Sequence, residues 1–564
     1  MLNHLSTPMK WLNENSRKFL AKGYLKEGQT AEERVRIIVD RAEEILAIKG
    51  FADKFYDYMS KGYYSLSTPV WTNFGARKGL PISCFGSYIS DDMGQILYTQ
   101  AEVGMMSKFG GGTSGYFGAL RQRGAHITDN GVSSGSVHFM RLFESIVNVV
   151  SQGSTRRGHF SPYLPIEHPD ADEFLDIGTE GNPIQELTHA VTVTNEWMKE
   201  MIAGDAKKRS LWAKVLERRS QMGYPYIFFT DTVNNNTVDV YKDKKLKIYG
   251  SNLCSEVLLP SSQKWSFVCD LSSMNLLYYD VWKDTDAVEM LVYFLDAVMT
   301  EFIQKLEQLR DADNKEDNMA FLFMERSYNF AVANRALGVG VLGWHSLLQS
   351  KMLAFESMEA AKLNVKIFET IKERAYAASK ELAKLFGEPS LLAGYGRRNT
   401  TLCAVAPTTS SAFILGQVSQ SIEPVWSNCY VKDIDKMKVT IKNPFLEELL
   451  KKKEKNDKET WHSIRDNDGS VQHLSFLTQK EKDIFKTFAE IDQYTVIEQA
   501  AVRQLYIDQG QSVNLMINPR TPIKDVNALY IEAWKQGVKT LYYQHSMNAA
   551  QTLNRKKLCV SCES

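Results

Sequence analysis

The chain has 564 residues, enough for about three or four domains of ordinary size or for one elaborate barrel. Hydrophobic residues make up 44% of the chain and charged residues 24%, which excludes a disordered, fibrous or membrane-embedded protein. Lys and Arg number 67, as do Asp and Glu, so the formal net charge is zero and a general nucleic-acid-binding function is disfavoured. The sequence has neither a long apolar stretch nor a signal-peptide core, so we predict a cytoplasmic protein without a membrane span.

The N-terminal residues predict a small helical segment. Apolar residues recur at helical spacing between residues 11 and 60. Thr30 and Glu33 have the spacing of a capping box, which marks the start of a helix.

The remaining chain predicts an α/β arrangement. Between residues 64 and 270, short β-prone runs alternate with helical stretches, as in α/β proteins. The charged run 449–469 predicts a solvated helix end and a surface loop. Long helices are predicted at 284–310 and 356–386. A β-rich and loop-rich portion follows at 399–430, and a closing helix is predicted at 524–536.

Gly338, Gly340 and Gly343 match the dinucleotide-binding pattern G-x-G-x-x-G. That pattern requires a hydrophobic strand leading into its first glycine, and residues 329–335 read as a mixed segment instead. We therefore predict close backbone packing at these glycines rather than a nucleotide site.

Asn252, Cys254 and Glu256 place an amide, a thiol and a carboxylate at every second position. In an extended segment or a strand-end loop, this spacing points all three side chains the same way. The triplet is a candidate reaction centre, although such a pattern also arises by chance.

Seven cysteines are too few for a secreted disulfide scaffold. Cys559 and Cys562 form a C-x-x-C pair two residues from the C-terminus, without the second ligand pair that zinc requires. The pair predicts a dithiol on a mobile tail, with an incidental surface pair as the alternative. Cys403 and Cys429 are predicted to be small core residues.

Two further segments are ambiguous on their own. The four hydroxyl residues 408–411 predict an anion site if a helix begins there, or else a plain N-cap turn. Tyr542 and Tyr543 by themselves predict a half-buried strand.

Taken together, the motifs resemble the catalytic large subunit of class I ribonucleotide reductase, from about residue 15 to the C-terminus. No single motif is specific, but all of them occur in the order and at the spacing of that family. The motifs are 81–85, 252–256, 267–271, 335–343, 407–411, 541–543 and the C-terminal C-x-x-C.

The resemblance implies a ten-stranded α/β barrel, built from two five-stranded halves around a central finger loop that carries Cys254. The implied domains are a helical segment at 1–63, the barrel at 64–545 and a mobile redox tail at 546–564. An N-terminal ATP-cone domain is expected to be missing, and with it overall inhibition by dATP through such a domain.

The same resemblance implies the chemistry. Cys254 becomes a thiyl radical that abstracts the 3′ hydrogen of a ribonucleotide, Glu256 takes the 3′ hydroxyl proton, and Asn252 holds a ribose hydroxyl. Cys84 and Cys269 protonate the departing 2′ hydroxyl and end as a disulfide.

Radical transfer and reduction of that disulfide involve other residues in the family. Tyr542 and Tyr543 relay the oxidising equivalent from a partner subunit to Cys254, which favours class I over the cobalamin-dependent class. Cys559 and Cys562 shuttle electrons to the buried disulfide.

The family also binds nucleotides at two kinds of site. The allosteric effector is expected near Asp91, Arg121 and Gln152. The residues that resemble substrate-binding positions are Thr68, Ser83, Gly112, Pro407, Thr408, Thr409, Ser410 and Ser411.

The implied partners are a ribonucleoside diphosphate substrate, a radical-generating small (beta) subunit, a thioredoxin- or glutaredoxin-like reductant and a second copy of the chain. No metal or permanently bound cofactor is expected in this chain, and dNTP or ATP would act as effectors. Two alternatives remain: an adenosylcobalamin-dependent reductase and a non-catalytic nucleotide-binding regulator.

Overall fold

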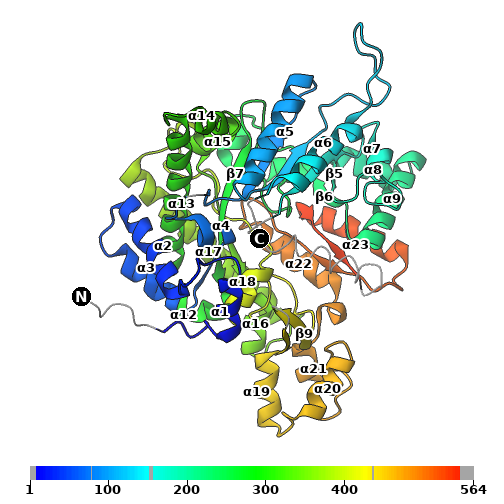
Figure 1. The fold of residues 1–564 in the computed structure, drawn as a ribbon. Coiled ribbons are helices and arrows are strands. Elements are labelled where there is room, and N and C mark those ends of the chain that lie inside the picture. Colours follow the sequence, from blue (N-terminus) through cyan, green and yellow to red (C-terminus); the bar gives the residue numbers. More distant parts are fainter. Residues whose placement is uncertain (1–7, 78, 152–156, 435–436, 547–564) are drawn as a thin grey trace.

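The computed structural model describes residues 8–77, 79–151, 157–434 and 437–546 (Figure 1). The chain begins with three helices, α1 (Glu14–Ala21), α2 (Ala31–Leu46) and α3 (Phe51–Ser60). Thr30 and Glu33 form the predicted capping box at the start of α2. Helix α2 packs against the long helix α13 (Ala287–Arg310), so the helical segment lies beside the sheet. Among the described helices, none combines the length and apolar character that a membrane span requires.

The first half of the sheet contains five parallel strands. Each strand pairs with the next one in sequence, and helices such as α5 (Met93–Lys108) and α6 (Ser136–Val149) connect them. The strands of this half are β2 (Cys84–Tyr88), β3 (Gly112–Tyr116), β4 (His159–Pro165), β5 (Ala190–Val193) and β6 (Tyr226–Phe229).

The second half is also parallel, but its pairing is less regular. It begins with β7 (Phe267–Asn275) and β8 (Leu337–Leu342), which run side by side. The extended segments 402–405, 510–516 and 540–545 follow. They are joined by the bridges Val339–Cys403 and Val405–Gln511 and by the parallel pair β11 (Leu515–Met516) and β13 (Gln544–His545).

Two antiparallel contacts join the halves into a ring. Strand β2 pairs with β7, and β6 pairs with β12 (Thr540–Leu541). Within the described residues, ten extended segments therefore close a barrel of two five-stranded halves, which confirms the predicted fold. A short strand, β1 (Tyr64–Leu66), extends the edge by pairing with the far end of β7.

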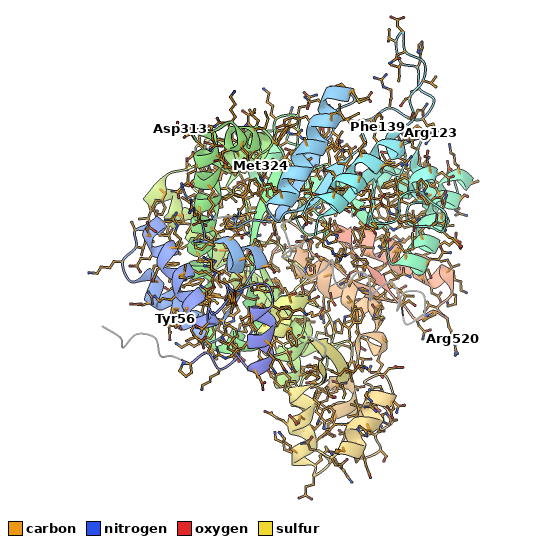
Figure 2. The ribbon with its side chains drawn as sticks, in the orientation of Figure 1. Tyr56, Arg123, Phe139, Asp313, Met324 and Arg520 are labelled. Atoms are coloured by element: carbon orange, nitrogen blue, oxygen red, sulfur yellow. The ribbon has the colours of Figure 1, made fainter. Side chains whose placement is uncertain are left out.

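The remaining helices surround this barrel. Figure 2 shows side chains filling the space between the strands and the helices, with Arg123, Asp313 and Arg520 at the periphery. The larger helices are α8 (Asn195–Ala203), α9 (Ala206–Met222), α14 (Lys315–Leu322), α15 (Glu325–Asn334), α17 (Met358–Phe386), α22 (Gln493–Gln504) and α23 (Ile523–Lys535). The short ones are α4 (Thr68–Asn73), α7 (Ala171–Phe174), α10 (Thr230–Asn235), α11 (Asp239–Asp243), η1 (Leu276–Tyr278), α12 (Tyr279–Trp282), α16 (Trp344–Ser350), η2 (Ser390–Leu392), α18 (Thr409–Ile414) and η3 (Phe488–Glu490).

A buried ion pair anchors this shell near the start of the barrel. Arg326 of α15 donates to both carboxylate oxygens of Glu102 on α5, and both side chains are almost fully buried. The hydroxyl groups of Ser87 on β2 and Ser266 before β7 donate to the same carboxylate at 2.7 Å. One carboxylate therefore connects two helices with the two strands that join the halves of the barrel.

Two of the three glycines of the G-x-G-x-x-G pattern lie in a strand, and Gly343 is the N-cap of the helix that follows it. Gly338 and Gly340 are inside β8, where a Cβ atom on Gly340 would lie 2.7 Å from the carbonyl oxygen of Ala404. The neighbouring segment of the barrel approaches too closely for any side chain. This contact confirms the predicted packing role.

An insertion projects from the barrel at residues 427–486. It contains β9 (Cys429–Ile434), β10 (Met437–Lys442), α19 (Pro444–Lys452), α20 (Lys458–Asp466) and α21 (Gln479–Ile484), and Figure 1 shows it standing apart from the other helices. The charged run 449–469 spans the end of α19 and all of α20. The prediction of a surface loop there was partly wrong, because Trp461 and Ile464 of α20 are buried in a small core of the insertion itself.

Candidate active site

The loop between α11 and β7 enters the barrel and carries Cys254 at its turn. Ser255 has a φ of 71°, a left-handed conformation that reverses the chain directly after Cys254. Ser114 on β3 and Tyr163 on β4 donate hydrogen bonds to the loop carbonyls of Ser251 and Asn252, at 2.7 and 2.8 Å.

The other half of the barrel also holds this loop. The hydroxyl of Thr540 donates to the carbonyl of Ser255 at 2.9 Å, and the amide of Gly510 donates to the carbonyl of Glu256 at 2.9 Å. Cys254 is 6% exposed. Strands from both halves thus fix the loop in the centre of the barrel, as expected for a finger loop.

Asn252 and Glu256 are in direct contact. The amide Nδ2 of Asn252 donates to Glu256 Oε1 at 3.0 Å, and Ser512 donates to the other carboxyl oxygen at 3.1 Å. Burial raises the pKa of Glu256 to about 7, although both hydrogen bonds oppose that rise. A carboxyl group with this pKa exchanges protons near neutral pH, as a general acid or base requires.

Cys84 and Cys269 face each other across the contact between β2 and β7, where they are register partners. Cys269 is a free thiol and is fully buried. Burial raises the pKa of Cys269 well above its usual value. The side-chain amide of Gln509 opposes that rise by donating to the Cys269 sulfur at 3.3 Å.

These groups surround one cavity of about 60 Å³. Three of the predicted cysteines and Glu256 reach it from three different parts of the chain. The lining residues are Ser67, Pro69, Ile82, Ser83, Cys84, Cys254, Glu256, Cys269, Asp270, Leu271, Ala406 and Pro407.

The predicted substrate-binding residues lie at the edge of this cavity or next to it. Ser83 and Pro407 line it directly, and Thr68 begins α4 beside Ser67. Gly112 is the register partner of Cys84 in β3, and its amide donates to the carbonyl of Ser83 at 2.7 Å.

The hydroxyl run 408–411 does begin a helix. Thr408 is the N-cap of α18, which starts at Thr409. Ser410 is 3% exposed, and its hydroxyl has no hydrogen-bond partner among the described residues. A buried polar group of this kind is normally satisfied, so a ligand oxygen at this position would complete it.

Tyr542 and Tyr543 lie between β12 and β13, on the opposite side of the barrel ring from the cysteine pair. Their ring centroids are 4.5 Å apart, and both residues are buried. Tyr226 on β6 contacts both rings, and Arg219 donates to the carbonyl of Tyr542 at 2.7 Å. The two tyrosines therefore have direct ring contact within a rigid setting.

Of the predicted effector residues, two meet in an ion pair. Arg121 Nε lies 2.8 Å from Asp91 Oδ2, and both side chains are partly exposed. Gln152 lies outside the described residues, as do Cys559 and Cys562. Cys403 and Cys429 are both buried, in agreement with the prediction of core residues.

Sequence reasoning missed two residues that hold the site together. Gln509 contacts Cys269 and also accepts a hydrogen bond from the amide of Leu258 in the finger loop. Ser512 holds Glu256 and donates to the carbonyl of Cys254. The only signal in the sequence is that the polar run 508–512 lies between apolar segments, which is unusual for a surface loop.

The family comparisons agree with this geometry. The family description "Ribonucleotide reductase, barrel domain" matches residues 82–207, 202–392 and 390–544. The description "Ribonucleotide reductase, all-alpha domain" matches residues 10–79.

Individual proteins are similar over most of their length. A putative ribonucleoside-diphosphate reductase large subunit of Frog virus 3 is 36% identical over 87% of this chain and 87% of its own length. The ribonucleoside-diphosphate reductase large subunit of Invertebrate iridescent virus 3 is 31% identical over 93% of this chain and 92% of its own length. The structure of the Actinobacillus ureae class Id ribonucleotide reductase alpha subunit is 54% identical and has a TM-score of 0.89, covering 99% of this chain and 100% of the other.

The fold, the buried thiols around one cavity and these matches lead to the same conclusion. The chain belongs to the family of ribonucleotide reductase large subunits.

Proposed function

We propose that the chain is the catalytic subunit of a ribonucleoside-diphosphate reductase, which converts ribonucleotides to 2′-deoxyribonucleotides. The observation that carries the proposal is the single cavity lined by Cys254, Glu256 and the register pair Cys84–Cys269. A radical-forming thiol, a proton acceptor and a two-electron reductant are the groups that this reaction requires.

The reaction then follows from the positions of these groups. Cys254, as a thiyl radical, takes the 3′ hydrogen atom of the ribose, while Glu256 takes the proton of the 3′ hydroxyl. The 2′ hydroxyl takes a proton from the Cys84–Cys269 pair and leaves as water. The pair also supplies the hydrogen that replaces it at the 2′ carbon and becomes a disulfide, so that it delivers two electrons in all, and Glu256 returns its proton to the 3′ oxygen. Cys254 finally returns a hydrogen atom to the 3′ carbon and is a thiyl radical again.

Asn252 has a supporting role in this scheme. Its hydrogen bond to Glu256 orients the carboxyl group, and its remaining amide hydrogen is available for a ribose hydroxyl. The substrate phosphates would be held by Thr408, Thr409, Ser410 and Ser411. The strongest indication is the hydroxyl of Ser410, which is unpaired within the part of the chain that the structure describes.

The radical would come from a small subunit and pass through the tyrosine pair. Tyrosine loses an electron and a proton together, so Tyr543 and Tyr542, in ring contact, can pass an oxidising equivalent toward Cys254. Their burial protects such a radical from solvent. Because the tyrosine pair would relay a radical from a small subunit, the proposal favours a class I mechanism over a cobalamin-dependent one.

The proposal also includes the reduction of the active-site disulfide and the binding of an allosteric effector. Cys559 and Cys562 would pass electrons from a thioredoxin- or glutaredoxin-like protein to the Cys84–Cys269 disulfide. Such thiol chemistry suits the reducing cytoplasm. Asp91 and Arg121 would contact a dNTP or ATP effector, with Gln152 near it, at the interface of a homodimer.

The test is conversion of labelled CDP to dCDP by the wild-type chain and by Cys254→Ala, with dithiothreitol and ATP. Candidate small subunits are compared with adenosylcobalamin in parallel assays. The proposal expects product only when a small subunit and Cys254 are both present.

Two other results would overturn parts of the proposal. Product with adenosylcobalamin alone would place the chain in the cobalamin-dependent class and leave the tyrosines as packing residues. No product with any small subunit, together with effector binding of normal affinity, would favour a non-catalytic regulator.

A further inference from the structure

An aromatic series continues outward from the tyrosine pair. The ring of Tyr543 lies 5.4 Å from the imidazole of His545, and the planes are 31° apart. The imidazole in turn lies 4.5 Å from the indole of Trp426. Centroid distances of this size correspond to direct ring contact. Tyr542, Tyr543, His545 and Trp426 therefore form one continuous series, named the aromatic series below.

The aromatic series runs from the interior of the barrel toward the surface. Tyr542 is 2% exposed and Tyr543 is 6% exposed, whereas His545 and Trp426 are half-buried. Trp426 also lines a cavity of about 750 Å³ between the barrel and the insertion. The indole is thus more accessible to a partner molecule than either tyrosine.

Two other tyrosine rings that contact Tyr543 lie in the interior of the protein. Tyr226 and Tyr224 contact Tyr543 at 5.2 and 6.4 Å. They are 1% and 7% exposed, and burial raises the pKa of Tyr224 to about 12. This branch is buried, and Tyr224 provides a matched control for the aromatic series.

Trp426 has a proton acceptor in place. Its indole Nε1 donates to Glu423 Oε2 at 3.0 Å, and Glu423 is buried. Asn514 donates to the other carboxyl oxygen of Glu423 and accepts the backbone N–H of Tyr543 at 3.0 Å. Burial raises the pKa of Glu423, so its carboxylate is a stronger base than that of an exposed glutamate. Asn514 thus connects the Trp426–Glu423 pair to the backbone of Tyr543.

We infer that Trp426 is a redox-active residue that receives the oxidising equivalent from the partner subunit and passes it to Tyr543 across His545. This inference rests on the proposed function, because it extends the radical path proposed there. The inference is supported by three features that lie together: the half-buried indole of Trp426, the Glu423 carboxylate that accepts its N–H, and the ring contacts that lead through His545 to Tyr543.

The electrons and protons of this step balance. The radical of the partner takes one electron from the indole, whose Nε1 proton passes to the Glu423 carboxylate. Tyr543 then returns an electron to the indole, and Glu423 returns the proton. The phenolic proton of Tyr543 passes to the imidazole of His545, which holds it until Tyr543 is reduced in turn.

The experiment replaces Trp426 site-specifically with mono- and tetrafluorotryptophan in the full chain and measures CDP reduction with a small subunit that supports wild-type turnover. Fluorination changes the oxidation potential of the indole with little change in its shape. The rate is expected to fall progressively with fluorination, and Trp426→Phe is expected to lower kcat by at least about tenfold. Trp426→Tyr is expected to regain part of the activity that Trp426→Phe loses. Samples of Trp426→Tyr frozen during turnover are expected to show a tyrosyl radical signal.

Controls separate this role from a structural one. Tyr224→Phe is expected to retain wild-type activity, and all variants are expected to keep the wild-type melting temperature and affinity for the small subunit. Equal rates for tryptophan and its fluorinated analogues would overturn the inference. Absence of turnover in the wild-type chain with every small subunit would instead count against the proposed function itself.

Discussion

Cys84 and Cys269 are register partners on two antiparallel strands, although they come from different halves of the barrel. Directly opposed residues in such a pair have Cα atoms about 4.5–5.5 Å apart, within the range that a disulfide bond spans. The two thiols can therefore be oxidised to a disulfide without movement of the strands.

This relationship predicts the product of a single turnover. When the shuttle pair is removed by Cys559→Ser and Cys562→Ser, the prereduced chain without external reductant is expected to form about one deoxynucleotide and one disulfide per active site, because Cys84 and Cys269 supply two electrons. Peptide mapping after alkylation should place that disulfide between Cys84 and Cys269. Cys403 and Cys429 are internal controls, since both are buried elsewhere and should stay reduced. A disulfide to either control residue would contradict the assignment.

The pKa of Glu256 predicts a pH dependence of activity. Because its pKa is raised to about 7, the side chain is protonated below that pH and cannot accept the 3′ hydroxyl proton. We expect kcat/KM for CDP to fall about tenfold per unit as the pH decreases below 7. Glu256→Gln should lower kcat by about 100-fold or more and remove this limb of the profile. An unchanged acidic limb in the variant would assign the titration to another group.

Gln509 is expected to tune the reactivity of Cys269. The donor Nε2 lies 3.3 Å from the sulfur and favours its thiolate form, so Gln509→Leu should raise the pKa of Cys269 further. The loss of one hydrogen bond to a charged group, about 1.5 kcal/mol, corresponds to about tenfold slower disulfide formation at neutral pH. The measurement is the rate of oxidation of Cys84 and Cys269 by diamide as a function of pH.

A second variant separates this effect from a displaced finger loop. Gln509→Glu keeps an acceptor for the amide of Leu258 but removes the donor to Cys269. Both variants should therefore slow oxidation. A wild-type rate in Gln509→Glu would show that the loop contact, and not the donor, accounts for the effect.

The buried pair of Arg326 and Glu102 predicts a large stability change. Arg326→Met leaves the Glu102 carboxylate buried with only two serine donors, at a cost of about 3–5 kcal/mol in the free energy of unfolding. Urea denaturation measures this change. Arg310→Met, which removes the exposed ion pair with Asp311, should leave the urea midpoint nearly unchanged. Similar losses in both variants would show that the buried pair is not an anchor.

The C-terminal pair Cys559 and Cys562 predicts a split between single and multiple turnover. A chain truncated before Cys559 should complete one turnover when prereduced, because Cys84 and Cys269 are already thiols. Multiple turnover with thioredoxin should be lost, since the disulfide then forms inside the barrel, out of reach of a protein reductant. Equal multiple-turnover rates for the truncated and full chains would rule out the shuttle.

Local sequence signals predicted local structure well. Thr30 and Glu33 marked the start of α2, and the hydroxyl run marked the start of α18. The closing of the barrel was implied only by the family resemblance, because the segments 402–405 and 510–516 form few regular strand pairs. Hydrophobic periodicity identifies a strand but not its neighbour.

In the active site, too, contacts between residues close in sequence could be predicted, whereas contacts between distant residues could not. Asn252 and Glu256 were predicted to point the same way in an extended segment or a strand-end loop, and they meet in a loop with a turn at Ser255. Gln509 and Ser512 could not be predicted, because they reach the site from more than two hundred residues away in the chain. Contacts of this range depend on tertiary packing, which has no local pattern.

The two antiparallel contacts that close the barrel also divide its redox chemistry. One contact, between β2 and β7, carries the thiol pair, and the other, between β6 and β12, borders the tyrosines. In the proposed reaction, each turnover would place a disulfide across one seam of the barrel, and each reduction would remove it. Because the stapled cysteines are far apart in sequence, the oxidised chain should resist unfolding by about 4–5 kcal/mol more than the reduced one. The proposed reaction cycle would therefore also be a cycle of stability, in which the reductant returns the barrel to its less stable, uncrosslinked form.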